Sequence, residues 1–416
     1  MEPTQQQPPL QTRLQVDTLS TTRRQLRIAV VTETYPPEVN GVAMTTGRIV
    51  DGLLRLGHEV QLIRPRQTPE DTPEKSDGFE EMLSRGIPIP KYNHLKMGLP
   101  ARNALLRAWS QQRPDIVQVV TEGPLGWSAV SAARKLKLPV ITEFHTNFHS
   151  YTRYYGMGWL KQPLAAYLRR FHNKGDLCLV PTDSLRHELL DSGFNTVEVV
   201  ARGVDTDLFN PLRRSDALRA AWGARPDTLV CMLVSRLAPE KNLELAARAF
   251  EQIRQTQPDA RFVLVGDGPA RAALQARYPH FHFAGMRAGE DLAAHYASGD
   301  LFLFPSLTET FGNVITEALA SGQPVIGFDY AAAAEVLHPE HNGLRPPLGD
   351  EAAFIASANR LAAEHALRQA MRARARESVL QIDWQAVVLR LAGMLEQVIA
   401  QHQGRSRARR GMALAE

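Results

Sequence analysis

"PSLTETFGNVITEALASGQPVIGF", residues 305–328, overlaps an apolar run, "DLFLFPS", at 300–306. The stretch predicts a buried strand, a polar loop, and a helix that stops at Ser321-Gly322. A second apolar run, "PVIGFDY", follows at 324–330. Two continuous apolar strands joined by a helix are typical of a parallel βαβ unit whose sheet is covered on both faces.

The same alternation extends over most of the chain. Apolar runs lie at 26–32, 59–65, 115–121, 139–145, 176–182 and 196–202, and again at 229–237, 260–269, 281–286, 300–306 and 324–330. Between the two groups, a stretch rich in Pro and charge at about 203–228 predicts an interdomain connection. The sequence therefore predicts two doubly wound α/β domains in tandem, with ligands in a cleft between their strand ends.

We predict five segments along the chain. They are a disordered tail over 1–25, an N-terminal Rossmann-like domain over 26–205, a C-terminal Rossmann-like domain over 206–378, a closing helix over 379–402, and a basic flexible tail over 403–416. The first tail is rich in Gln, Pro and Thr and has no apolar core of a signal peptide. In the closing helix, apolar residues at helical spacing predict one buried face that packs on either domain: Val387, Leu391, Met394, Leu395 and Ile399.

Composition limits the classes of function. The chain has 416 residues, 44% of them hydrophobic, so two cores of ordinary size are expected. Cys178 and Cys231 lie in apolar runs, as buried thiols in a reducing cytoplasm would. No run is long enough to span a bilayer, so any membrane contact is expected to be peripheral, on the inner face of the cell membrane. The net charge of +4 is modest, and we predict no nucleic-acid partner.

Basic patches are candidates for contact with an anionic lipid surface. They lie at 85–109, which includes Trp109, at 153–174, which includes Trp159, and at 405–416. A solvated basic face explains the same patches equally well.

Two glutamates frame the loop and helix of the opening stretch. Glu309 lies in the loop after a strand, and Glu317 lies inside the helix. A carboxylate inside that helix suits a diol such as ribose, and one in the loop suits a second hydroxylated ring. The backbone near Gly312 and Asn313 suits an anion between the two rings. An exposed helix residue remains the alternative for Glu317.

Cations are predicted at another strand end. In "VSRLAPEKNL", Arg236 follows a strand and Lys241 precedes a helix, so both can converge on a diphosphate. At the first strand end, Gly41 permits close approach of backbone N–H groups to a phosphate. His145 ends another strand and is placed to hydrogen-bond a ligand in the cleft, whereas His149 is read as structural.

Other motifs are set aside. The first βα loop is not G-x-G-x-x-G, and "GDGPAR" at 266–271 lacks the third glycine, which argues against a dinucleotide site. Asp205 and Asp207 form a D-x-D pattern that we interpret as turn chemistry rather than a metal site. We predict neither a metal nor a cofactor.

Taken together, these motifs resemble the retaining GT-B glycosyltransferases of family 4. The resemblance covers about 27–400 and rests on "ETFGNVITE", "SRLAPEKNL", "RFVLVGDGP", "GVDTDLFNP" and the opening "TETYPPEVNGVAMTTGRIVDGLLRLGHEV". It implies a metal-independent hexosyltransferase that retains anomeric configuration, with a nucleotide-sugar donor and a lipid or glycan acceptor.

The resemblance also implies roles for single residues. Arg236 and Lys241 would hold the diphosphate and Glu317 the ribose, while Glu309 and the backbone of Phe311, Gly312 and Asn313 would hold the transferred sugar. Gly41 would pack against the diphosphate, and His145 would line the sugar site.

The sequence departs from the family in one place. Many relatives carry Gly-Gly-x-x-E where this chain reads "DYAAAAEVL" at 329–337, which keeps Glu335 but not the glycines. The stretch "EFHTNFHSYTRYYG" resembles the subgroup of the family that uses GDP-mannose or UDP-hexoses on lipid or glycan acceptors. This resemblance implies GDP-mannose as donor, with UDP-glucose next. A nucleotide-sugar epimerase, a phosphorylase and a nonenzymatic binding protein on the same plan are the remaining alternatives.

Overall fold

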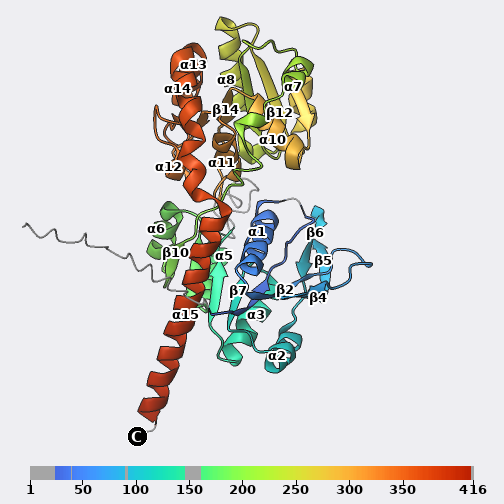
Figure 1. The fold of residues 1–416 in the computed structure, drawn as a ribbon, viewed down its shortest axis with the longest axis vertical. Helices are drawn as coiled ribbons and strands as arrows, with labels where there is room; N and C mark the ends of the chain where they lie inside the picture. The colour runs from blue at the N-terminus through green and yellow to red at the C-terminus, as the bar shows by residue number, and fades with distance from the viewer. Residues whose placement is uncertain (1–23, 39, 90–91, 146–160, 414–416) are drawn as a thin grey trace, which may run out of the picture.

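The computed structural model describes residues 24–38, 40–89, 92–145 and 161–413. Two α/β domains follow one another along the long axis of the molecule (Figure 1). The predicted N-terminal tail falls almost entirely outside the described residues, as do His149 and Trp159.

The N-terminal domain is built on an eight-stranded sheet in the order β10-β9-β8-β7-β1-β2-β4-β3. Neighbouring strands are parallel except for β3 and β4. The strands are β1 (Arg27–Val31), β2 (Glu59–Pro65), β3 (Lys75–Ser76), β4 (Phe79–Ser84), β7 (Ile116–Val119), β8 (Val140–Glu143), β9 (Leu177–Val180) and β10 (Val197–Val199). The helices are α1 (Gly41–Arg55), α2 (Arg102–Gln111), α3 (Pro124–Lys135), α5 (Lys161–His172) and α6 (Asp183–Asp191).

The C-terminal domain has a six-stranded parallel sheet in the order β13-β12-β11-β14-β15-β16. The strands are β11 (Val230–Val234), β12 (Arg261–Val265), β13 (His282–Gly285), β14 (Leu301–Phe304), β15 (Val325–Gly327) and β16 (Gly343–Leu344). The helices are α7 (Asp216–Ala221), α8 (Leu243–Thr256), α9 (Arg271–Arg277), α10 (Gly289–Ser298), α11 (Asn313–Ala320), α12 (Ala331–Val336), α13 (Glu351–Ala363) and α14 (His365–Ala375), with short 3-10 turns η2 (Pro211–Arg213), η3 (Pro239–Lys241) and η4 (Glu377–Ile382).

Each sheet reverses its strand order once, between β1 and β7 in the first domain and between β11 and β14 in the second. Loops leave the sheet in opposite directions at such a point and open a crevice at the strand ends, where ligands bind. The predicted Arg236 and Lys241 follow β11, and Glu309 follows β14. The fold therefore brings the two predicted halves of the donor site to one crevice.

The predicted strands are confirmed at every apolar run. Both cysteines are buried free thiols, as expected. Strands β3 to β6 and β16 were not predicted. β3 and β16 have only two residues each, a proline interrupts β5, and β4 and β6 carry polar and charged residues. The antiparallel pair β5 (Gly86–Ile89) and β6 (Tyr92–Gly98) and helix α2 occupy the stretch read as a basic patch.

Trp109 corrects that reading of the patch. Its side chain is fully buried on α2, and its indole N–H donates to the Gln61 side chain at 3.0 Å. A buried indole cannot contact a lipid surface, so Trp109 belongs to the core of the N-terminal domain.

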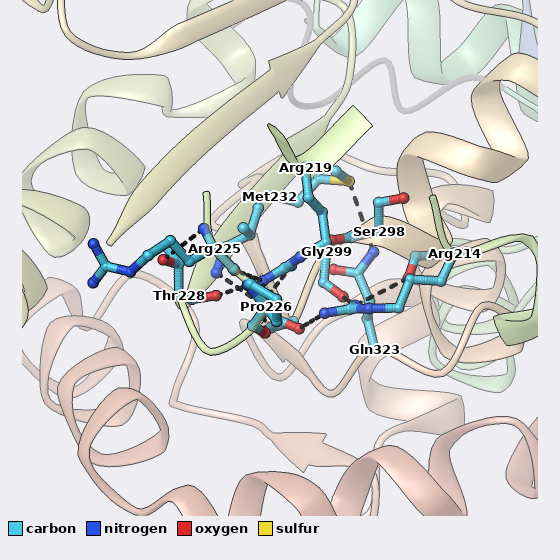
Figure 2. Close-up of polar contacts among 12 residues, drawn as sticks. Arg214, Arg219, Arg225, Pro226, Thr228, Met232, Ser298, Gly299 and Gln323 are labelled. Atoms are coloured by element: carbon cyan, nitrogen blue, oxygen red, sulfur yellow. Dashed lines mark hydrogen bonds and ion pairs between the residues drawn. The ribbon is translucent and has the colours of Figure 1, made fainter. Parts of the chain in front are cut away.

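The predicted connection at about 203–228 is largely packed structure. Arg219 of α7 is 2% exposed and donates to the Ser298 carbonyl at 2.9 Å and to Asp300 at 3.0 Å. Figure 2 shows this arginine reaching toward the backbone around Ser298 and Gly299, with Arg214 beside it. Trp222 is also buried in the core of the C-terminal domain. Most of the segment is therefore part of that domain, because a buried guanidinium fixes it to the sheet.

The closing helix, α15 (Trp384–Ala413), returns to the N-terminal domain. Its apolar face joins a core cluster of that domain through Val388, Leu391, Ala392, Leu395, Val398 and Ile399. A Cβ built on Gly52 of α1 would lie 2.5 Å from Val388, so α1 and α15 are in close contact. Figure 1 shows the helix continuing past the domain. The predicted flexible tail from 403 is thus helical to Ala413, since no proline interrupts the segment and Ala and Arg favour helix.

Candidate active site

The loop after β11 carries the predicted phosphate-binding cations. Ser235 N–H donates to the Val265 carbonyl at 3.0 Å, and Leu237 N–H donates to the Asp267 carbonyl at 2.9 Å. Gly266 has φ +126°, and a Cβ there would lie 1.9 Å from the Ser235 carbonyl oxygen. The glycines of "GDGP" therefore allow the two loops to pack directly together, which fixes the backbone around Arg236.

Lys241 and Glu309 meet across the crevice. The Lys241 ammonium group forms an ion pair with the Glu309 carboxylate, and their side chains are 17% and 14% exposed. Arg236 pairs with Glu240, the residue before Lys241. The ammonium nitrogen also lies 5.9 Å from the ring centroid of Phe304. Two oppositely charged pairs, Lys241 with Glu309 and Arg236 with Glu240, thus gather at the switch point of the C-terminal domain.

The Glu309 loop enters α11 through a left-handed turn. Gly312 has φ +102°, and α11 begins at Asn313 without a side-chain cap. Phe311 is 4% exposed and packs in the core, while its carbonyl accepts from Ala332 N–H at 2.8 Å. The Tyr330 hydroxyl donates to the Glu309 carbonyl at 2.9 Å. The uncapped N–H groups of α11 therefore belong to a loop held from two sides.

Glu317 is not an exposed helix residue. The Tyr296 hydroxyl donates to its carboxylate at 2.9 Å. Burial raises the pKa of Glu317 to about 7, and the Tyr296 hydrogen bond opposes the shift. The Tyr296 hydroxyl thus binds one of the two carboxylate oxygens, Oε2, and orients the group.

His145 lies at the contact between the domains, with its ring directed into the N-terminal domain. The ring nitrogens lie 2.8 Å from Glu143 and 2.5 Å from Arg202, and the side chain is 4% exposed. Burial and the neighbouring Arg202 lower the pKa of His145. Its backbone carbonyl accepts from the Thr310 hydroxyl at 2.8 Å. The residue thus joins the Glu309 loop to β8 through its backbone, and its predicted contact with the sugar stays a prediction.

Gly41 opens α1 at the first strand end. It is exposed, and a Cβ built there would meet nothing within 4 Å. The Asn40 side chain accepts from Val42 N–H at 3.1 Å and Ala43 N–H at 2.9 Å. Gly41 is therefore open to its surroundings, and Asn40 already caps two of the nearby N–H groups.

Asp205 performs the turn chemistry expected of it. Its carboxylate accepts from Leu208 N–H at 2.9 Å and pairs with Arg48 at 2.8 Å. Within the described residues, no group of three or more potential ligands is arranged to hold a metal ion. Likewise, none of the described helices is both long and apolar enough to span a membrane.

Sequence reasoning missed several residues that hold the site. Tyr296 and Tyr330 support Glu317 and Glu309 from elements that no local motif connects to them. Glu335 accepts from Asp183 N–H at the start of α6, at 2.9 Å, and so links the domains. In the sequence, the contact between Glu335 and Asp183 was indicated only by the retained glutamate in "DYAAAAEVL".

Solved structures with a similar fold are glycosyltransferases of the GT-B class. The sucrose-phosphate synthase of Thermosynechococcus elongatus superposes with a TM-score of 0.72 at 19% identity, over 91% of this chain and all of that one. An Anabaena protein solved in complex with UDP superposes with a TM-score of 0.69 at 17% identity, over 89% of this chain and all of that one. The fold is therefore GT-B, with two Rossmann-like domains.

Sequence comparison gives the family. Residues 39–208 match Glycosyltransferase Family 4, and residues 228–364 match Glycosyl transferases group 1. The chain is 34% identical to a GDP-mannose-dependent alpha-mannosyltransferase of Mycobacterium tuberculosis, over 90% of this chain and 97% of the relative. It is 28% identical to the sulfoquinovosyl transferase SQD2 of Arabidopsis thaliana, over 88% and 72%. The chain belongs to glycosyltransferase family 4, as its motifs predicted, and is a glycosyltransferase enzyme.

Proposed function

We propose that this enzyme transfers mannose from GDP-mannose to a hydroxyl of a lipid or glycan acceptor, with retention of configuration and without a metal ion. The structural observation that most strongly supports this proposal is the Lys241–Glu309 ion pair at the switch point of the C-terminal domain. The mannosyltransferase relatives from mycobacteria and Corynebacterium glutamicum support the choice of donor. UDP-glucose is the second candidate, because two relatives at 27% and 26% identity are alpha-monoglucosyldiacylglycerol synthases, whose name indicates a transferred glucose.

The charges of the site fit departure of a nucleoside diphosphate. Negative charge develops on the leaving oxygen as the glycosidic bond breaks, and Arg236 and Lys241 would stabilise it without a metal. Binding of the diphosphate would draw Lys241 away from Glu309 and free that carboxylate for the sugar hydroxyls. Glu317, supported by Tyr296, would accept hydrogen bonds from the ribose.

Retention follows if the acceptor attacks from the side of the leaving group. A phosphate oxygen of the donor would then take the proton of the acceptor hydroxyl. The His145 ring, which Glu143 and Arg202 hold on both sides, is not required as a base in this scheme. Its backbone bond to Thr310 would instead keep the sugar-binding loop against the acceptor domain.

A panel of nucleotide sugars tests the donor. The purified chain is incubated with GDP-mannose, UDP-glucose, UDP-galactose and GDP-glucose, and the nucleoside diphosphate released by slow hydrolysis is measured. We expect the fastest release from GDP-mannose. Faster release from UDP-glucose would favour the second candidate, and release of an epimerised nucleotide sugar would identify an epimerase. Binding without any turnover would identify a nonenzymatic protein.

Metal independence has its own test. Turnover is measured after treatment with EDTA and after addition of Mg²⁺ or Mn²⁺, and we expect no change. The Asp205→Asn variant should retain turnover, because Asp205 is bound to Leu208 N–H and Arg48. Strict dependence on either metal would contradict the proposed scheme.

Contact with an anionic membrane is a further part of the proposal. The support is the basic sequence at 405–410, on the part of α15 that continues past the N-terminal domain (Figure 1). Cosedimentation with vesicles of phosphatidylcholine containing phosphatidylglycerol tests this contact. We expect binding that high salt abolishes and that is lost when residues 404–416 are removed. Equal binding by the truncated chain would show that another surface of the protein contacts the membrane.

A further inference from the structure

Arg202 lies in the chain segment that first connects the two domains. It follows β10, and two residues further on Val204 N–H donates to the carbonyl of Ile382, in the returning connection, at 3.0 Å. A Cβ built on Gly203 would lie 2.7 Å from the Trp384 ring, so the start of α15 packs directly on the first connection. Arg202 is therefore buried at the point where the chain leaves the N-terminal domain.

The His145 ring lies between Arg202 and Glu143. A guanidinium N–H of Arg202 donates to Nδ1 at 2.5 Å, and Nε2 lies 2.8 Å from a Glu143 carboxylate oxygen. An arginine can only donate, so Nδ1 must carry a lone pair, and the proton of the neutral ring must lie on Nε2, where it faces the carboxylate. The two partners therefore select one neutral tautomer of His145.

The charges around the ring balance without a proton on Nδ1. Arg202 supplies a positive charge, and Glu143, which also accepts from the Gln118 amide at 2.5 Å, supplies a negative one. Burial and Arg202 lower the pKa of His145, whereas Glu143 and the more distant Glu122 oppose the shift. A proton on Nδ1 would set an imidazolium against the guanidinium, so the ring would have to move.

A small cavity borders Arg202, His145 and Glu143. Thr45 lines it from α1 and Trp384 from the start of α15, and its other lining residues are apolar, so these helices bring no titratable group to the cavity. Among the described residues, the guanidinium has one hydrogen-bond partner, His145. Because the packing leaves a gap beside the two side chains, their hydrogen bond is what fixes them relative to each other.

The backbone of His145 reaches the C-terminal domain. Its carbonyl accepts from the Thr310 hydroxyl at 2.8 Å. Thr310 directly follows Glu309, whose carboxylate pairs with Lys241. A displacement of the His145 ring would carry its backbone with it and disturb the bond to Thr310. One residue thus links the guanidinium of Arg202 to the loop of Glu309.

We propose that Arg202 is a positioning residue for sugar transfer: it holds His145 as the neutral tautomer with its proton on Nε2, and through the His145 carbonyl it fixes the Glu309 loop against the N-terminal domain. The inference rests on the proposed function only in assigning the transferred sugar to the Glu309 loop.

NMR of the wild-type chain labelled with ¹⁵N-histidine tests the tautomer without any substrate. The His145→Gln variant identifies the signals of this ring. We expect a bare Nδ1 and a protonated Nε2, unchanged between pH 8 and pH 6, because the bond from Arg202 opposes protonation. A proton on Nδ1 at pH 7 would contradict the proposal, whether or not any variant folds.

Removal of Arg202 should change the protonation of the ring. In Arg202→Met the buried carboxylate of Glu143 loses its cation, so we expect both ring nitrogens to carry protons at pH 6. In the double variant Arg202→Met/Glu143→Gln the ring should be neutral again, because no charge remains to pair with an imidazolium. Arg48→Met is the matched control: it removes a guanidinium that contacts the same connection, at Asp205, and should leave the His145 signals unchanged.

The effect on the reaction is read from slow hydrolysis of GDP-mannose. In a folded Arg202→Met variant we expect kcat to fall at least about tenfold, because a displaced sugar-binding loop misplaces the reacting group. The dissociation constant of GDP, measured by calorimetry, should not change, because Arg236, Lys241 and Glu317, to which we assign the nucleotide, all lie in the C-terminal domain. A merely structural role of Arg202 would not separate kcat from nucleotide binding in this way.

Two further results would overturn the proposal. A ring that stays neutral at pH 6 in folded Arg202→Met would show that Arg202 does not set its protonation, and an unchanged kcat in that variant would show that the Glu309 loop does not depend on it. A wrong donor assignment is recognised separately, since the wild-type chain would then not hydrolyse GDP-mannose while the NMR results would stand.

Discussion

The Lys241 ammonium group and the Glu309 carboxylate are 68 residues apart in sequence and form an ion pair in the crevice between β11 and β14. Each residue was predicted to bind a different part of the donor. Under the proposed function, donor binding would exchange one set of charge partners for another, and the pairing of the two residues limits the cost of holding buried charges before the donor arrives.

Loss of either cation should reduce turnover. In Arg236→Ala and Lys241→Ala we expect kcat/KM to fall by roughly ten- to a hundredfold each, because one charged hydrogen bond to the leaving group is worth about 1.5 to 3 kcal/mol. Steady-state kinetics at saturating acceptor measures this. Arg248→Ala is the control, since Arg248 pairs with Glu351 on an exposed surface. Near-normal kcat/KM in both site variants would contradict the assignment of Arg236 and Lys241 to the diphosphate of the donor.

The two glutamates should fail in different ways. Glu317→Gln should chiefly weaken donor binding, because a ribose contact is similar in the ground state and the transition state. Glu309→Gln should chiefly lower kcat, because the ring it contacts gains positive charge in the transition state. Calorimetry with free nucleoside diphosphate separates them. Equal weakening of that binding in both variants would show that the roles are wrongly assigned.

Glu317 should make the folded state less stable as the pH rises. Its pKa is raised from 4.5 to about 7, so between these values the folded chain binds a proton that the unfolded chain has lost. The free energy of unfolding therefore falls as pH rises through this window, by up to about 3 kcal/mol for this group. In Glu317→Gln, urea unfolding at pH 5 and pH 8 should show a smaller fall than in wild type. An identical fall in the variant and the wild type would show that another group causes the pH dependence of stability, which would contradict the prediction.

Ala331 should tolerate glycine with a gain in stability. It begins α12 with φ +51°, a left-handed conformation that costs a non-glycine residue about 1 kcal/mol. Ala331→Gly should therefore raise the free energy of unfolding by about 1 kcal/mol or less, after the entropy cost of glycine. Ala333→Gly, in the same helix and also buried, is the control and should lose about 1 kcal/mol or more. A loss in Ala331→Gly would contradict the strain argument.

The arginine cluster around Asp300 should hold the C-terminal domain together. Asp300 pairs with Arg214, Arg219 and Arg372 at 2.7 to 3.0 Å. Burial alone would raise the pKa of Asp300, but these cations lower it. Arg219→Met removes a buried partner and should cost about 3 to 5 kcal/mol in urea unfolding. Arg225→Ala, whose side chain is largely exposed, should change stability little. If Arg219→Met changes the free energy of unfolding little, Arg214 and Arg372 suffice to pair with Asp300 and the prediction is wrong.

Much of the fold was readable from local pattern. Continuous apolar runs predicted the central strands, because a parallel sheet covered on both faces needs apolar side chains on both. The pair β5 and β6 gave no such signal, because a proline interrupts β5 and because β6 carries polar and basic residues. Trp109 was interpreted as part of a basic surface patch because its neighbours Arg102 and Arg107 are basic. Those two arginines are exposed, whereas the Trp109 ring is buried.

The placement of the candidate site residues in the fold was predictable where they lie in one motif. "ETFGNVITE" and "SRLAPEKNL" gave Glu309, Glu317, Arg236 and Lys241, because the spacing of a strand end and a helix start fixes where those side chains point. Tyr296 and Tyr330 were not predicted, because a supporting hydrogen bond depends on which distant element packs alongside.

The helix predicted over residues 379–402 begins at Trp384 in the structure, after the 3-10 turn η4. The sequence by itself determined that this helix has one buried face, because side chains at 3.6-residue spacing must find an apolar partner. It left open which domain supplies that partner. Tertiary structure alone decided that α15 returns to the N-terminal domain, where Gly52 of α1 lets Val388 approach closely. Periodicity reports how much of a helix is buried, whereas its partner is set by the complementary surface that folding brings to it from far along the chain.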